Sequence, residues 1–214
     1  FVTLSGKGEQ IADTGVVTFN PGSSRNSYLK LMGFDETVAG INDSTGRGVI
    51  EVVEDENIGS AGSTLILGGS GTYSYSGYMR DRWNGTSGAL SLAKTGSGTQ
   101  TLAGGNIAYT GSTTVNEGRL VFQNTTAMAN GSSTASFDIG PNGTLEFNGA
   151  QNIGSNAAGN TTFTGTGTLL KTGTGMLALG NQGNNTYKVN LNMTGGWIDI
   201  QEGSIRNGGW QGGV

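Results

Sequence analysis

The acidic residues Glu51, Glu54, Asp55 and Glu56 form the densest group of side chains that could do chemistry. In a strand Glu54 and Glu56 share a face, where paired carboxylates could bind calcium or flank a sugar as in glycosidases. The structural alternative is a solvated, charged edge that discourages mispairing of strands. We favour the structural interpretation, and therefore expect no catalytic residue, no metal and no cofactor.

Aromatic residues are densest at Tyr73, Tyr75 and Tyr78, and Trp83 follows in the charged loop 80–85. Tyr73 and Tyr75 lie on one face of a strand, from which their rings could stack on a sugar. These four residues are therefore candidate glycan contacts. The alternative, which we favour, is packing against neighbouring strands for the tyrosines and an ordinary exposed turn for the loop.

Histidine and cysteine are both absent from the chain. Their absence excludes Ser-His and Cys-His nucleophile pairs and sites built from imidazole or thiolate ligands. A hydrolase would have to rely on carboxylates or on a Ser-Lys pair. Glycine-rich strings such as 173–175 lack the Gly-Lys-Ser/Thr ending of a phosphate-binding loop.

The composition restricts the fold that must position these residues. The chain of 214 residues has 41 Gly, 2 Pro, 12% charged residues and a net charge of −4. Glycine is not periodic, which excludes collagen, and regularly spaced apolar residues argue against disorder. Scattered basic residues predict no nucleic-acid partner, and no apolar run is long enough to predict a membrane-spanning segment.

Short alternating strands bounded by Gly or Asn recur along the chain. Each places alternate apolar residues on one side, as in a half-buried strand, and no segment has the apolar spacing of a helix. We expect the following pairs to point into one continuous core: Leu29/Leu31, Leu65/Leu67, Leu120/Phe122, Leu145/Phe147 and Ile198/Ile200.

Two stretches repeat each other at an offset of 77 to 78 residues, so that Lys94 recurs as Lys171. Each copy holds several strands and therefore spans more than one structural layer. The first copy contributes Leu92, Lys94, Thr95, Gly96, Gly98, Leu102, Tyr109, Gly118, Leu120 and Phe122, and the second Leu169, Lys171, Thr172, Gly173, Gly175, Leu179, Tyr187, Gly196, Ile198 and Ile200.

This pattern resembles the autotransporter-associated β-strand repeat, also called the passenger-associated transport repeat. Gln100 departs from it, because the family usually has an apolar residue there. The resemblance implies a right-handed parallel β-helix exported to the bacterial exterior or cell surface, and it implies no chemistry. We expect one all-β domain over residues 1–214, with repeat rounds within 29–122 and 145–200.

Coils of about 20 residues would give about ten layers and a rod of roughly 50 Å. Such a rod fits a structural role as a stalk, surface coat or fibre segment that also adheres. The alternative is a carbohydrate-binding or polysaccharide-cleaving β-helix, since enzymes of these classes share the architecture.

The ends of a β-helix expose unpaired backbone groups and an apolar core, so they need caps or partners. Strand-like residues at the N-terminus (Phe1, Val2 and Leu4) and the apolar residues Ile205 and Trp210 near the other end make poor polar caps. We therefore expect contact with identical copies, head to tail, or with adjoining coils of a longer parent chain. Surface glycans are a further candidate partner.

Overall fold

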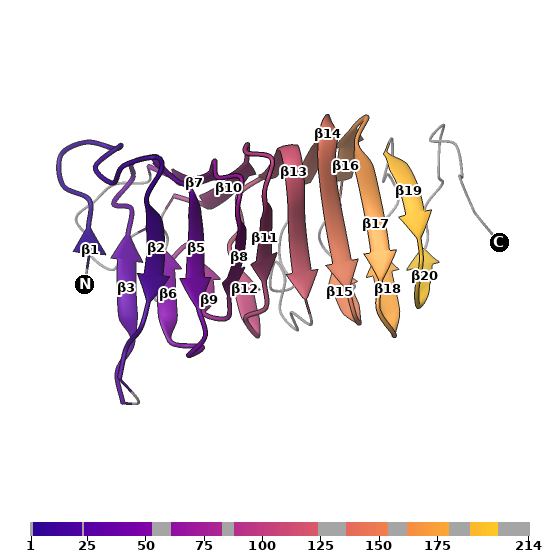
Figure 1. Cartoon of the computed structure of the whole chain (residues 1–214), viewed down its shortest axis with the longest axis horizontal. Coiled ribbons are helices and arrows are strands. Elements are labelled where there is room, and N and C mark those ends of the chain that lie inside the picture. Colours follow the sequence, from indigo (N-terminus) through magenta and orange to yellow (C-terminus); the bar gives the residue numbers. More distant parts are fainter. Residues whose placement is uncertain are drawn as a thin grey trace.

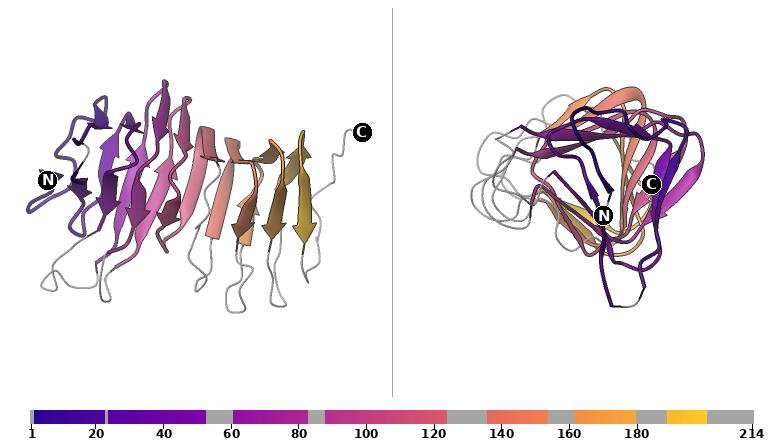
Figure 2. Two further views of the ribbon diagram at one scale, coloured as in Figure 1. Left: turned by 90° about the horizontal axis from the view of Figure 1, so that it is seen from below. Right: turned by 90° about the vertical axis from the view of Figure 1, so that its left-hand side faces the viewer.

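The protein is a parallel β-helix. A computed structural model describes residues 2–22, 24–52, 61–82, 88–123, 136–153, 162–179 and 189–200. Within these ranges the only regular elements are strands, and every strand pairing is parallel. The strands stand side by side along the long axis and surround a central core when viewed down it (Figures 1 and 2). The expected all-β solenoid is confirmed.

Each coil visits three faces in turn. The strands of the first face are β1 (Val2–Thr3), β3 (Ser27–Lys30), β6 (Gly48–Glu51), β9 (Tyr78–Arg80) and β12 (Asn106–Ala108), and the same place in later coils is taken by β15 (Gln151–Ile153), β18 (Met176–Leu179) and β20 (Trp197–Ile200).

The second and third faces belong to one sheet, because two long strands bend from one face to the other. These strands are β13 (Thr113–Gln123) and β14 (Ser136–Asn148). Their first halves join the second face with β4 (Glu36–Val38), β7 (Ser63–Leu67), β10 (Leu90–Lys94) and β16 (Thr162–Gly165). Their second halves join the third face with β2 (Val16–Phe19), β5 (Gly40–Asp43), β8 (Thr72–Tyr75), β11 (Thr99–Leu102), β17 (Thr168–Thr172) and β19 (Asn190–Met193).

The core is formed by the alternate apolar residues that the sequence predicts to point inward. The first four predicted pairs are fully buried, Ile198 packs half-buried against the core, and the side chain of Ile200 lies outside the described part. Four phenylalanines stack between coils, with ring centroids 5.5 Å apart for Phe122 and Phe147 and 4.9 Å apart for Phe137 and Phe163. Such pairs add about 0.5–1.5 kcal/mol each beyond the burial of their area.

Coil lengths differ from the expected value of about 20 residues. The advance from one coil to the next ranges from 20 residues between Leu102 and Phe122 to 32 between Asp43 and Tyr75. The third face therefore has eight rungs in the described part of the chain, fewer than the ten predicted. No helix within those ranges is long and apolar enough to span a bilayer.

Candidate functional site

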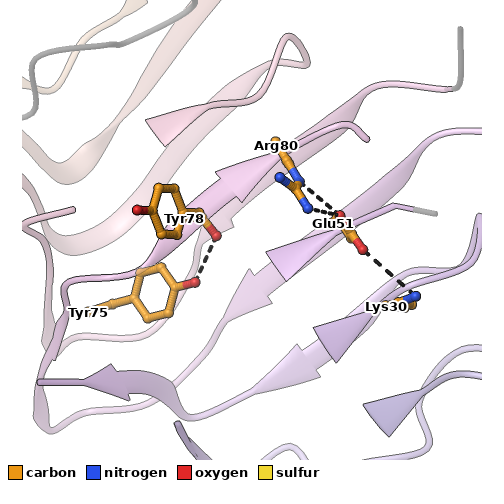
Figure 3. A network of polar contacts seen from close by, with 5 residues as sticks. All are labelled: Lys30, Glu51, Tyr75, Tyr78 and Arg80. Atoms are coloured by element: carbon orange, nitrogen blue, oxygen red, sulfur yellow. Dashed lines mark hydrogen bonds and ion pairs between the residues drawn. The ribbon is translucent and has the colours of Figure 1, made fainter. Parts of the chain in front are cut away.

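An ion-pair ladder lies on the outer side of the first face, where β3, β6 and β9 stack (Figure 3). Glu51 stands in register between Lys30 and Arg80 and is completely buried. Arg80 Nε and Nη2 both lie 2.8 Å from Glu51 Oε2, and Lys30 Nζ lies 4.0 Å from Oε1. A carboxylate held by an arginine in this way is a cross-strand tie and is poorly placed to serve as a general acid or base.

The carboxylate pair that the sequence predicts to share a face, Glu54 and Glu56, lies outside the described residues. Asp55 also lies outside them, and Glu51 is taken up by the ladder. Within the described ranges no three Asp or Glu side chains come together in a way that could hold a metal ion.

The candidate glycan contacts separate by burial. Tyr75 is completely buried, and its hydroxyl donates a hydrogen bond to the carbonyl oxygen of Tyr78 at 2.8 Å. Burial, reinforced by the Asp43 carboxylate, raises the pKa of Tyr75 well above its ordinary value, so the phenol stays a donor. The half-buried ring of Tyr73 covers Gly40 in the preceding coil. Neither ring is presented to solvent as a platform, and Trp83 lies outside the described residues.

Tyr78 is different, because its side chain is 38% exposed on the outer side of the first face. The register places Tyr28 in the same ladder two rungs away, with Val49 between them. Sequence reasoning missed Tyr28. The signal that could have found it is the shared pattern of a tyrosine two residues before a cation, in Tyr28-x-Lys30 and Tyr78-x-Arg80.

A second buried carboxylate is tied in the same way on the third face. Glu146 accepts hydrogen bonds from Arg119 on one side and from the Thr172 hydroxyl on the other. Its partners in register are Val121 and Leu170, so Arg119 and Thr172 reach it diagonally from the two neighbouring strands, and together they satisfy both carboxylate oxygens. Like Glu51, this residue joins adjacent coils, and its own carboxylate is fully occupied by these contacts.

The N-terminal end of the helix has an apolar groove of about 380 Å³ between the edge strands β1 and β2. Its lining includes Val2, Ile11, Val17, Phe19 and Leu29. Val2 is 54% exposed, whereas Leu4 is already buried in the core. The other residues expected to mediate end contacts, Phe1, Ile205 and Trp210, lie outside the described part.

One side of this end is capped, which the sequence analysis did not anticipate. The buried Glu36 carboxylate accepts the backbone N–H groups of Gln10 (3.0 Å) and Ile11 (2.6 Å), and Glu9 binds Thr37. Residues 9–11 therefore cover the first strand of the second face. The open part of the end lies between the first and third faces.

The lysine shared by the two repeats has a structural role at a corner. Lys94 and Lys171 point inward at the ends of their strands and are almost completely buried. Lys94 Nζ donates to the carbonyl of Gly96, and Lys171 Nζ donates to the carbonyls of Thr172 and Gly173. Burial lowers the pKa of both lysines, and the Glu117 and Glu146 carboxylates partly oppose this.

Repeat glycines complete these corners. Gly118 and Gly196 both have positive φ, at 71° and 68°, a backbone conformation that residues other than glycine rarely adopt. A Cβ on Gly196 would lie 2.8 Å from Lys171 Nζ. In the second copy the glycine therefore leaves room for the buried lysine of the preceding coil, whereas in the first copy Gly118 leaves room for the backbone carbonyls of Gly96 and Gly98.

The family model of the passenger-associated-transport-repeat matches the chain at residues 92–122 and 169–206. Within each copy the first strand pairs with a later strand of the same copy. Leu92 is in register with Thr113 in the first copy, and Leu169 is in register with Leu191 in the second. The copies nevertheless occupy different faces, since Leu92 lies on the second and Leu169 on the third. No curated protein and no solved structure matches the chain.

Proposed function

We propose that this chain, a passenger-type β-helix with two transport repeats, serves outside the bacterial cell as a structural stalk, surface coat or fibre segment. The observation that carries this proposal is the use of the repeat residues. The leucines and Phe122 fill the core, while the repeat lysines and glycines build corners. None of these residues forms a reactive group at the surface.

The outer surface of the third face supports the same role. One ladder there runs through Thr72, Thr99, Arg119, Thr144 and Thr168, which are in register along the helix axis. A surface of mostly hydroxyl side chains suits a solvated scaffold, whereas a cleaving enzyme would need carboxylates facing a substrate. Glu51 and Glu146, the two carboxylates buried on the outer sides of the strands, are instead bound to arginines, and the proposal includes no catalytic activity.

Assembly of the rod is the second part of the proposal. The open groove at the N-terminal end takes either the end of an identical copy or an adjoining coil of a longer parent chain. A contact of this head-to-tail kind does not close on itself and extends a filament.

Export and rod formation can be tested separately from binding. For this test the chain is fused behind a secretion signal and ahead of an outer-membrane anchor. Protease added to intact cells should leave the folded chain intact and should degrade it once it has been unfolded. Electron microscopy of the purified chain should show rods. Retention inside the cell, or polysaccharide cleavage that is lost in Glu51→Gln, would contradict the proposal.

A further inference from the structure

Two aromatic–cation pairs are repeated on the outer side of the first face near the N-terminal end. Tyr28 is followed by Lys30 on β3, and Tyr78 is followed by Arg80 on β9. The register aligns tyrosine with tyrosine and cation with cation, with Val49 and Glu51 of β6 between them. The two pairs are two rungs apart, so their spacing along the axis is about 10 Å.

The tyrosine line offers ring-sized contact surface. Tyr78 is 38% exposed and Tyr28 is half-buried, whereas Val49 between them is only 1% exposed. The Tyr78 backbone is fixed by the buried Tyr75 hydroxyl (Figure 3). In the next rung the half-buried side chain of Asn106 continues the line with an amide. Aromatic faces beside hydrogen-bonding amides are suited to pyranose rings, which have apolar faces and polar edges.

A line of cations runs beside the tyrosine line and gives this surface its positive charge. Two residues farther along each strand, or roughly 7 Å from the tyrosines, stand Lys30 and Arg80. The side chains of Lys30 and Arg80 are 12% and 16% exposed, whereas that of Glu51 is completely buried. A ligand on the tyrosines would therefore meet two cations at its edge, while the one carboxylate of the ladder is covered. Lys30 Nζ also lies 5.4 Å from the Tyr28 ring centroid, which holds cation and ring together.

We propose that this surface binds an extended, β-linked acidic polysaccharide that runs along the helix axis. Sugar rings stack on Tyr28 and Tyr78, and carboxylates of the same chain face Lys30 and Arg80. The spacing of about 10 Å is comparable to one extended disaccharide, so one carboxylate per disaccharide matches the two cations. Tyr28 also lines the groove at the N-terminal end, so the two proposed surfaces meet there. Binding of the polysaccharide does not require end-to-end assembly, and either proposal can fail without the other.

Calorimetric titration with two hexasaccharides tests the proposal. Hyaluronan hexasaccharide has one carboxylate per disaccharide, and cellohexaose is a neutral β-linked chain of the same number of rings. We expect saturable binding of the hyaluronan fragment that weakens as salt is raised, and binding of cellohexaose weaker by roughly ten-fold or more. Absence of saturable hyaluronan binding, or equal binding of both sugars, would overturn the proposal.

Variants locate the site. Tyr78→Ala should weaken binding by about ten-fold, while Tyr78→Phe should retain it because the ring is kept. Thr144→Ala, on the third face, is the matched control and should bind as the parent does. Glu51→Gln should bind the hyaluronan fragment more tightly and leave cellohexaose unaffected, because it removes the one negative charge of the ladder. A folded Tyr78→Ala variant with unchanged affinity would contradict the site.

Discussion

The side-chain amide of Gln100 pairs with both backbone polar groups of Ile41, although 59 residues separate them in the chain. Gln100 Oε1 accepts the Ile41 N–H and Nε2 donates to the Ile41 carbonyl, both at 3.0 Å. The strand between them, β8, is in register with β5 only at Tyr75 and Asp43, so the amide takes the place of missing ladder hydrogen bonds of β5. This explains a polar residue where the repeat usually has an apolar one.

Replacing Gln100 with Leu should therefore destabilise the protein even though Leu is the usual kind of residue. The Ile41 N–H and carbonyl would remain buried without partners, at a cost of about 1–3 kcal/mol. Urea unfolding followed by circular dichroism measures the loss. Thr99→Ala, at the neighbouring outward position, is the control and should change stability by less than about 0.5 kcal/mol. Equal stability of Gln100→Leu and the parent would refute this role.

Gly118→Ala tests the corner geometry of the repeat. Its φ of 71° is costly for alanine, by about 1–2 kcal/mol, and the new Cβ would press on the carbonyl oxygens of Gly96 and Gly98. We expect a loss of at least that size in urea unfolding. Gly22→Ala is the matched control, because no atom lies within 4 Å of its Cβ position. A similar small effect of both substitutions would show that the corner is not constrained.

The sequence predicted the parts of the fold that depend on local alternation. Inward pairs such as Leu120/Phe122 follow from a period of two, and corners such as Gly118 follow from glycine's tolerance of positive φ. The pairing partner of Gln100 could not be predicted, because it depends on which residues meet across two coils. Coil lengths between 20 and 32 residues decide that register.

The same reason explains what alternation could not resolve at the candidate site. Tyr73 and Tyr75 were correctly expected on one side of a strand, but alternation alone does not say that this side faces the core. Tyr28 and Tyr78 are 50 positions apart in the sequence and are brought into one ladder by the stacking of β3, β6 and β9. The displacement of the second repeat by one face is also a consequence of unequal coil lengths.

The buried repeat lysines predict that stability rises with pH in the mildly alkaline range. Burial lowers the pKa of Lys94 and Lys171 below the ordinary 10.5. Between the lowered value and 10.5 the unfolded chain binds more protons than the folded one, so the free energy of unfolding increases with pH. Urea titrations at a series of pH values measure it. In Lys94→Met/Lys171→Met the slope should be flatter, and an unchanged slope would assign it to other groups.

Buried tyrosines predict the opposite trend above pH 10. Burial raises the pKa of Tyr109, and of Tyr75, well above the ordinary 10.0. As the pH passes 10 the unfolded phenols lose protons while the folded ones keep them, so stability falls. Tyr109→Phe should reduce this alkaline loss, although it also removes the hydrogen bond to Thr113 at 2.6 Å. Thr113→Ala removes the same hydrogen bond but keeps the phenols, so it is the control and should retain the alkaline loss of stability.

The groove at the N-terminal end predicts which surface residue controls self-association. Val2 and Val16 are both exposed valines on edge strands, but only Val2 lines the groove. An added coil would bury position 2, and burying an unpaired carboxylate there is unfavourable. Val2→Asp should therefore weaken concentration-dependent association by about ten-fold or more, measured by light scattering and sedimentation. Val16→Asp should associate nearly as the parent does, because its side chain does not line the groove. A parent chain that stays monomeric at high concentration, or equal effects of the two substitutions, would rule out assembly through this end.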